Sequence, residues 1–306
     1  MTRKTDEFDV IIIGGGPGGL SAALWCAELG LNAILLEKKS EFGGQLLRTY
    51  NAIKNHLGAD AANGRELRDI FLRQAEKANF ARRCDSEVVE AELTEKKVVL
   101  ADGSQYRAHA IVIATGVSRR KLDIPGEAEF YDRGILESGE KAKNEVAGKR
   151  VMIVGGGDAA LENALILARV AERVFVVHRR SEFSARDVFL QGCLNNEKIE
   201  FILNTRVTAI VGNTVVDAAN IEEIPSGNRT RIAVDAVLIR VGEVPNTELF
   251  RGQIALDAAG FIIDESKCLT DLPDIYAIGD VANPLAPTIS AAVGMGATVA
   301  KLIIAY

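Results

Sequence analysis

Continuous runs of β-branched and aliphatic residues recur along this chain, separated by glycine-rich turns and by segments with helical periodicity. Apolar runs without alternating polar positions predict strands of a parallel sheet that is covered on both faces. One pattern occurs twice, as an apolar run, a glycine turn, a helical segment and a second apolar run. The helical segment and second run lie at residues 20–29 and 33–36 in the first copy, and at 160–170 and 174–177 in the second.

Two copies of strand, turn, helix and strand predict two doubly wound α/β units of the kind that binds dinucleotides. The first glycine of each turn permits a tight bend, the third lets the backbone approach a pyrophosphate, and the sixth position allows close packing of helix on strand. The pyrophosphate is expected at the helix N-terminus, where free N–H groups and the helix dipole favour an anion. The residues in these three positions are Gly14, Gly16 and Gly19 in the first turn, and Gly155, Gly157 and Ala160 in the second.

The residue that ends the second apolar run distinguishes the two units. From Gly14 to Glu37, and from Gly155 to His178, the chain advances by the same 23 positions. This position faces the adenosine ribose, so Glu37 suits the free diol of FAD or NAD, because a carboxylate repels a 2′-phosphate. In the second unit, a histidine and two arginines at 178–180 suit the 2′-phosphate of NADP through charge-assisted bonds. The alternative is an ordinary solvated basic loop.

Length and composition are those of a globular protein with two domains. The chain has 306 residues, of which 48% are hydrophobic and 25% charged, and a domain typically has roughly 100–200 residues. The net charge of −6 argues against nucleic acid as a partner, since phosphate binding needs a basic face.

The sequence predicts no membrane span and no secretory signal. The first residues are charged, and the apolar run at 10–13 is too short for either. The uncharged stretch at 281–300 contains prolines and glycines, which favours a loop leading into a buried helix.

The cysteines indicate reduced, mostly buried thiols in a cytoplasmic protein. They form no C-x-x-C pair and have no metal-ligand spacing, and with only three histidines no metal site is expected. The four residues are Cys26, Cys84, Cys193 and Cys268.

Short motifs along nearly the whole chain resemble those of the low-molecular-weight thioredoxin reductase family, within the flavoproteins that have two dinucleotide-binding domains. The resemblance implies an α/β fold with an NADPH-binding domain, residues 119–244, inserted in a split FAD-binding domain, residues 1–118 and 245–306. It also implies a homodimer. The motifs, in chain order, are Gly43-Gly44-Gln45-Leu46, Asn55-His56-Leu57-Gly58, Ala114-Thr115-Gly116, Pro245-Asn246-Thr247 and Ala277-Ile278-Gly279-Asp280.

Candidate cofactor contacts follow from the two turns and from these motifs. For FAD they are Gly14, Gly16, Pro17, Gly19, Glu37, Lys38, Gly44, Gln45, Leu46, Asn55, Ala114, Thr115, Gly116, Gly279, Asp280, Thr288 and Ile289. For NADP they are Gly155, Gly157, Asp158, Ala159, Ala160, Glu162, His178, Arg179, Arg180, Arg186, Val241 and Gly242.

The sequence departs from the family where the family carries its redox-active C-A-T-C segment. An alignment without gaps places Ser138 and Lys141 at the two cysteine positions. A serine hydroxyl forms neither a disulfide nor a thiolate beside the flavin, so dithiol relay to thioredoxin is not expected. In addition, Pro287-Thr288 replaces the family's R-Q pair, and Ser184 replaces the third arginine of its basic motif, with Arg186 two residues later.

These features predict an FAD-dependent oxidoreductase that passes a hydride from NADPH to FAD and then reduces an unidentified acceptor. The cofactors carry the chemistry, and no catalytic side chain stands out. One alternative is a ferredoxin or flavodoxin reductase, with a docking surface at the basic segment 119–121. Others are a disulfide reductase that uses another route, a reductase or oxidase of small molecules such as quinones, and a redox sensor that binds FAD and NADP without turnover.

Overall fold

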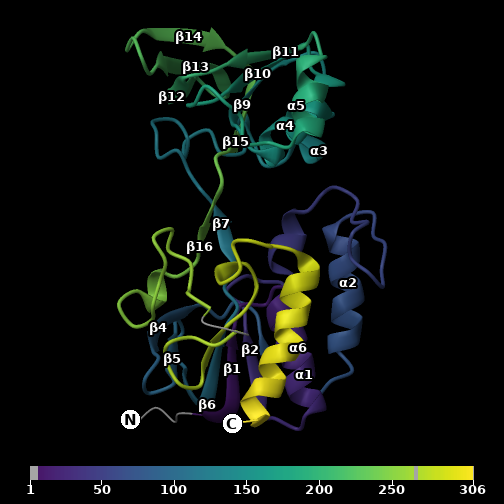
Figure 1. Cartoon of the computed structure of the whole chain (residues 1–306), viewed down its shortest axis with the longest axis vertical. Coiled ribbons are helices and arrows are strands. Elements are labelled where there is room, and N and C mark those ends of the chain that lie inside the picture. The colour runs from purple at the N-terminus through teal and green to yellow at the C-terminus, as the bar shows by residue number, and fades with distance from the viewer. Residues whose placement is uncertain (1–5, 265–267, 306) are drawn as a thin grey trace. The chain divides into compact units, whose positions relative to one another are not determined.

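The chain forms two compact units, and the computed structural model describes residues 6–264 and 268–305 (Figure 1). Unit 1 comprises Met1–Ser118 and Val244–Tyr306, and unit 2 comprises Arg119–Glu243. Unit 2 is therefore inserted within unit 1. The chain passes between them on β7 (Val117–Arg119) and β16 (Glu243–Pro245), which pair with each other.

Unit 1 is built on a seven-stranded sheet. The strand order is β3-β2-β1-β6-β5-β4, and β17 pairs with β6. The strands are β1 (Asp6–Ile13), β2 (Ala33–Leu36), β3 (Ala81–Arg83), β4 (Val88–Glu92), β5 (Lys97–Leu100), β6 (Gln105–Ile113) and β17 (Ile275–Ala277). The helices are α1 (Pro17–Glu28), α2 (Gly64–Ala75) and α6 (Ile289–Ala305), with short 3₁₀ turns η1 (Gly44–Arg48), η2 (Glu248–Phe250) and η3 (Gly279–Val281).

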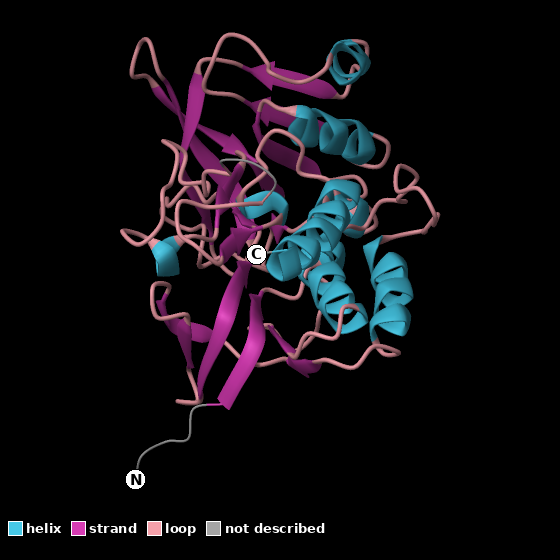
Figure 2. Ribbon diagram, turned by 60° about the horizontal axis from the view of Figure 1, so that its bottom comes forward, coloured by secondary structure: helices cyan, strands magenta, loops and turns pink. Residues whose placement is uncertain are grey.

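The carboxyl-terminal halves of the central strands β1 and β6, residues 10–13 and 110–113, are apolar at every position because both faces of the sheet are covered there. On β1, Val10 and Ile12 pack with α1 and α6, whereas Ile11 and Ile13 pack with the β4–β5 hairpin and with residues of 250–282. Helices α1, α2 and α6 gather on one side of the sheet (Figure 1), and a turned view again separates the helices from the strands (Figure 2).

Small residues allow α1 and α6 to approach closely. A β-carbon on Gly296 of α6 would lie 2.6 Å from the carbonyl oxygen of Gly18 on α1. Ser21 of α1 donates a hydrogen bond of 2.7 Å to the carbonyl oxygen of Val293. The C-terminal helix is thereby fixed against the helix that follows the first glycine turn.

Unit 2 repeats this design on a smaller scale. Its parallel five-stranded sheet has the order β11-β10-β9-β15-β8, and a separate antiparallel sheet has the order β12-β13-β14. The strands are β8 (Ile135–Leu136), β9 (Arg150–Gly155), β10 (Arg173–Val177), β11 (Ile199–Ile202), β12 (Thr205–Gly212), β13 (Val216–Glu223), β14 (Arg229–Ala233) and β15 (Ala236–Arg240). The helices are α3 (Gly139–Ala142), α4 (Asp158–Ala168) and α5 (Asp187–Leu194).

Strand β9 is also buried on both faces. Val151 and Ile153 belong to the core with α4, whereas Met152 and Val154 belong to the core with β12 and β13. Both helices that follow a glycine turn begin two or three residues earlier than the apolar periodicity predicts, at Pro17 and Asp158. Helical apolar spacing begins only where side chains are large enough to reach the core, so it misses the first turn. Among the described residues, no helix is long and apolar enough to cross a membrane.

Candidate functional site

The first glycine turn connects β1 to α1 and leaves backbone N–H groups open at the helix N-terminus. A β-carbon on Gly14, whose φ is +111°, would lie 2.3 Å from the carbonyl oxygen of Ala114. One on Gly19 would lie 1.9 Å from the carbonyl oxygen of Gly14. A β-carbon on Gly16 would meet no atom nearer than the α-carbon of Gly44, at 3.8 Å. This cradle has no room for side chains on its packed side and remains open where a pyrophosphate is expected.

Glu37, at the end of β2, is held against this turn. Its side chain is buried, and its two oxygens accept hydrogen bonds from the backbone N–H of Gly15, at 2.8 Å, and of Lys39, at 2.9 Å. A carboxylate has about four lone-pair sites, so acceptor capacity remains for a ribose diol. The neighbouring Lys38 is exposed.

Five of the other candidate FAD contacts follow strands whose carboxyl ends meet at one edge of the sheet. Ala114-Thr115-Gly116 follow β6, and Gly279-Asp280 follow β17. Burial raises the pKa of Asp280. Residues Gly44, Gln45 and Leu46 form η1, which approaches the glycine turn, since a β-carbon on Gly44 would lie 2.8 Å from the α-carbon of Gly16.

Three candidates lie elsewhere in unit 1. Asn55 is exposed in the loop before α2. Thr288 precedes α6, and its hydroxyl accepts a hydrogen bond of 3.1 Å from the backbone N–H of Ala291. Ile289 is the first residue of that helix.

One contact to this edge was not foreseen from the sequence. The Asn246 side chain donates a hydrogen bond of 2.7 Å to the Thr115 carbonyl oxygen, and the backbone carbonyl oxygen of Asn246 accepts one of 2.8 Å from the Thr115 hydroxyl. Asn246 stands in the motif Pro245-Asn246-Thr247, but the motif alone does not show which segment it contacts.

The second glycine turn connects β9 to α4 in unit 2. A β-carbon on Gly155, whose φ is +150°, would lie 2.1 Å from the Arg240 carbonyl oxygen. One on Gly156 would lie 2.3 Å from the ring of His178. A β-carbon on Gly157 would lie 3.8 Å from the Ser184 hydroxyl, with no nearer atom. Ala160 is fully buried. The turn is therefore closed on the side of the sheet and open at the N-terminus of α4, where Asp158 and Ala159 begin the helix.

The loop after β10 folds back over this turn. The His178 ring stacks on Phe183 at 5.3 Å and donates a hydrogen bond of 3.0 Å to the Glu182 carbonyl oxygen. Burial lowers the pKa of His178, the Glu182 carbonyl opposes this, and the charges of Arg180 and Arg179 lower it further. His178 is therefore neutral at pH 7, and the exposed guanidiniums of Arg179 and Arg180 carry the positive charge of this loop.

Of the other candidate NADP contacts, Arg186 is engaged by Asp158. Its Nε atom lies 2.5 Å from an Asp158 carboxylate oxygen. Glu162 lies within α4, and Val241 and Gly242 follow β15, whose carboxyl end lies beside that of β9.

The segment that aligns with the family's cysteine pair follows β8. Ser138 is buried, and the backbone N–H after it, of Gly139, donates a hydrogen bond of 2.8 Å to the Asn163 side chain. Lys141 forms an ion pair of 2.7 Å with Glu137. No residue from 138 to 142 has a thiol.

Two arginines hold this segment. The sequence singled out Arg119 only as part of a basic docking segment, and it gave no signal for Arg240. Arg119 on β7 and Arg240 at the end of β15 each donate a hydrogen bond of 2.6 Å to the Glu137 carbonyl oxygen. Burial, with the nearby charge of Arg119, lowers the pKa of Arg240 to about 10. Arg240 therefore still carries its charge at pH 7, and the nearby carboxylates of Glu137 and Glu243 oppose the lowering of its pKa.

None of the four thiols belongs to this segment. All are free, and Cys26, Cys193 and Cys268 are buried while Cys84 is partly exposed. Burial is the first cause that raises the pKa of each, to about 12 for Cys26 and Cys268 and to about 11 for Cys193. A protonated, buried thiol is a poor nucleophile.

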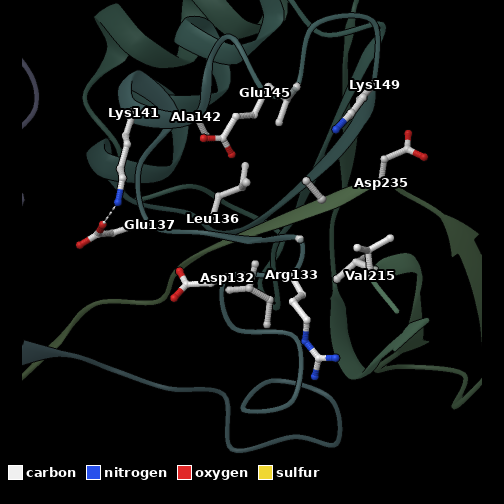
Figure 3. Close-up of a pocket in the computed structure, with 15 residues that line it drawn as sticks. Asp132, Arg133, Leu136, Glu137, Lys141, Ala142, Glu145, Lys149, Val215 and Asp235 are labelled. Carbon is white, nitrogen blue, oxygen red and sulfur yellow. Dashed lines mark hydrogen bonds and ion pairs between the residues drawn. The ribbon is translucent and has the colours of Figure 1, made fainter. Parts of the chain in front are cut away.

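A cavity of about 490 Å³ lies along β8 in unit 2 (Figure 3). Its lining includes Arg133, Lys141, Glu145, Lys149 and Asp235. Lys149 and Asp235 precede β9 and β15, so the cavity reaches the amino ends of these strands. Doubly wound sheets bind nucleotides at the carboxyl ends of their strands. The cavity is therefore not the nucleotide site.

Comparison with known proteins decides the family. Residues 8–296 match the family model of the pyridine nucleotide-disulphide oxidoreductases. The chain belongs to this family.

Several members and solved structures resemble this oxidoreductase over nearly their whole length. The thioredoxin reductase of Listeria monocytogenes is 36% identical over 303 residues, which cover 97% of this chain and 92% of that protein. The crystal structure of Lactococcus lactis thioredoxin reductase matches with a TM-score of 0.86 and 31% identity, over 97% of this chain and 98% of that one. The crystal structure of T. acidophilum thioredoxin reductase matches with a TM-score of 0.84 and 28% identity, over 98% of each chain.

This membership confirms several expectations from the sequence. The oxidoreductase has a mixed α/β fold with Rossmann-like FAD and NADPH domains, and it resembles thioredoxin reductase. It is an FAD-dependent enzyme, and its cofactors are FAD and NADPH. The open glycine cradles in both units fit these groups.

Proposed function

We propose that this enzyme transfers a hydride from NADPH to FAD and then reduces an acceptor outside the chain, without an active-site dithiol. The observation that carries the proposal is the segment at Ser138 and Lys141. It has no thiol, and it is held by Arg119 and Arg240 through the Glu137 carbonyl oxygen. In this proposal the chain shares its fold with relatives named thioredoxin reductase, but its electrons leave the flavin by a route that uses no dithiol of the chain.

In this proposal unit 1 holds FAD. The glycine cradle receives the pyrophosphate at the N-terminus of α1, and Glu37 accepts from the adenosine ribose. The residues after β6 and β17, with η1 and the start of α6, line the remaining length of the cofactor. The free N–H groups at the start of α6 supply partial positive charge, which favours negative charge on a bound group.

Unit 2 holds NADPH in the same way. The backbone at Gly157 and Asp158 approaches the pyrophosphate, and Arg179 and Arg180 bind the 2′-phosphate through charge-assisted hydrogen bonds. The His178 ring, neutral and fixed over Gly156, shapes the turn. When both cofactors are bound, they supply the hydride chemistry themselves, so the task of the chain is to position them.

The acceptor is a separate carrier protein or a small molecule. Ferredoxin and flavodoxin are acidic carriers of the kind that a basic surface steers. We further propose that the enzyme is a homodimer and works in the cytoplasm, where its four thiols remain reduced.

Rapid mixing under anaerobic conditions tests the hydride path. The purified protein with bound FAD is mixed with NADPH or with NADH, and the loss of the visible band of oxidised flavin is followed. We expect fast bleaching with NADPH and slow bleaching with NADH. An absence of bleaching with both would contradict turnover and would favour a cofactor-binding sensor.

The same reduced enzyme then tests the electron route. It is mixed with oxidised thioredoxin, with ferredoxin, with flavodoxin and with a quinone. Thioredoxin is expected to reoxidise the flavin no faster than buffer does. Rapid reoxidation by thioredoxin would show that a disulfide is reduced without the family's cysteine pair, and the proposed route would be wrong.

A further inference from the structure

The ion pair between Asp158 and Arg186 joins the nucleotide turn of unit 2 to the start of α5. Asp158 is the first residue of α4, and Arg186 immediately precedes α5. One carboxylate oxygen of Asp158 accepts from Arg186 Nε at 2.5 Å, and the other accepts from the Arg186 backbone N–H at 2.7 Å. The guanidinium also lies over the ring of Phe189, 4.9 Å from its centroid. Arg186 is thus held by a carboxylate and a ring of its own unit.

The position of Asp158 is unfavourable for a site that binds an anion. Free N–H groups at a helix N-terminus attract a carboxylate and a pyrophosphate alike, so the two negative groups compete for one positive field. The hydrogen bonds and charge of Arg186 keep the pKa of Asp158 below its usual range, so the carboxylate is ionised at pH 7. Without a nearby cation it would repel the pyrophosphate of any pyridine nucleotide.

The 2′-phosphate has other cations available. Arg179 and Arg180 directly follow His178, the residue whose register faces the adenosine ribose, and both are exposed. Their loop is tied to the glycine turn, because the Ser184 backbone N–H donates a hydrogen bond of 2.9 Å to the Gly156 carbonyl oxygen. Arg186 follows Ser184 in the chain and bonds to Asp158 at the N-terminus of α4.

We propose that Arg186 neutralises Asp158 and does not bind the 2′-phosphate. Arg186 then sets the affinity for NADP and NAD equally, whereas Arg179 and Arg180 alone select NADP. This revises the sequence-based expectation that Arg186 is a direct contact of NADP. The inference rests on the proposed binding of the nucleotide at this turn.

Calorimetric titration of the FAD-loaded protein with NADP⁺ and with NAD⁺ tests this division of roles. Arg186→Ala is expected to weaken both nucleotides by the same factor, about three- to tenfold, the size expected for one uncompensated charge in an exposed site. Asp158→Asn removes the repulsion, so the double variant is expected to return both affinities to within about twofold of the parent protein. Arg179→Ala is expected to weaken NADP⁺ only.

A matched control separates this effect from the loss of any surface arginine. Arg231 on β14 forms an exposed ion pair of 2.7 Å with Asp217 in the same unit, away from the glycine turn. Arg231→Ala is expected to change neither affinity. Thermal unfolding of each variant shows whether the fold is retained. If Arg186→Ala unfolds, the NADP⁺ and NAD⁺ affinities of Asp158→Asn alone can still be measured.

Three results would overturn the inference. If Arg186→Ala weakens NADP⁺ alone and Asp158→Asn does not rescue it, Arg186 is a direct ligand of the 2′-phosphate. If Arg186→Ala leaves both affinities unchanged, the ion pair has no part in nucleotide binding. If the parent protein binds neither nucleotide, or if Arg179→Ala is without effect on NADP⁺, the proposed nucleotide site itself is wrong.

Discussion

The imidazole ring of His178 lies over Gly156, so close that a β-carbon on Gly156 would fall 2.3 Å from the ring atom Cε1. The first unit has a related arrangement, in which Glu37 accepts a hydrogen bond of 2.8 Å from the backbone N–H of Gly15. In both units the middle glycine of the turn, Gly15 or Gly156, contacts the side chain of the residue after the second strand of the repeat, Glu37 or His178. The glycine turn and the residue that we propose to face the adenosine ribose are therefore packed against each other in both units.

Gly156→Ala is expected to destabilise unit 2 by about 1–3 kcal/mol, the usual range for overpacking. The His178 ring cannot retreat freely, because it stacks on Phe183 and bonds to the Glu182 carbonyl oxygen. Denaturant unfolding measures the loss, and titration with NADP⁺ measures the expected fall in affinity. In the double variant Gly156→Ala/His178→Ala the clash is gone, so most of the stability is expected to return. No loss in the single variant would show that the ring moves aside at little cost.

Glu37→Ala is expected to lower the flavin content of the purified protein. The substitution leaves the backbone N–H groups of Gly15 and Lys39 without their acceptor, and a buried unsatisfied donor costs about 1–3 kcal/mol. The ratio of visible flavin absorbance to protein absorbance measures the content. Glu90→Ala, at an exposed position on β4, serves as the control and is expected to retain full flavin. Equal flavin in both variants would remove Glu37 from the proposed site.

The thiols of the native protein are expected to react slowly with a disulfide reagent at pH 8. Burial raises the pKa to about 12 for Cys26 and Cys268 and to about 11 for Cys193, so their thiolate fractions are very small. Only Cys84 is partly exposed, and burial raises its pKa as well. Labelling before and after unfolding counts the reactive thiols, with at most one expected in the folded protein.

A second measurement asks whether any thiol relays electrons. Alanine at Cys84, Cys193 and Cys268 together is expected to leave NADPH-dependent turnover with every acceptor unchanged. A fall in disulfide reduction alone would show a thiol relay outside the family position.

Asp280 is expected to make the stability of the flavin-free protein depend on pH. Burial raises the pKa of Asp280 in the folded state, above the usual aspartate value of about 3.9 in the unfolded chain. As pH rises, the folded protein therefore keeps this proton longer than the unfolded chain does. The contribution of Asp280 to stability is complete below its pKa in the unfolded chain, and it is lost as pH rises through its pKa in the folded protein. Above the folded-state pKa of Asp280, the Asp280→Asn variant is expected to be more stable than the wild-type protein. Below the unfolded-state pKa this difference is expected to disappear.

Thermal unfolding of flavin-free wild-type and Asp280→Asn protein from pH 3 to pH 8 follows this difference. A stability difference that stays constant over the whole range would mean that Asp280 titrates normally in the folded protein. The flavin content of Asp280→Asn is a separate readout of its proposed place in the FAD site.

Local patterns were sufficient for the repeated units. Apolar runs buried on both faces, glycine turns and the constant interval to Glu37 and His178 all arise within short stretches of chain, where covalent geometry and burial act together. Strand β2 matches its predicted range of 33–36, whereas α1 and α4 begin earlier than their apolar periodicity. The motif series added the insertion of one domain within the other, which periodicity alone does not show.

The sequence by itself determined that this protein has two dinucleotide-binding units and no C-x-x-C pair. It also determined that an acidic residue follows one glycine turn and a basic cluster follows the other at the same interval. Only the tertiary structure decided which partners these groups have. Arg119 and Arg240 meet at the Glu137 carbonyl oxygen although they lie on separate strands, and Arg186 pairs with Asp158 rather than extending the basic cluster. Such contacts depend on the geometry of several packed elements at once, and no short window of sequence contains that information.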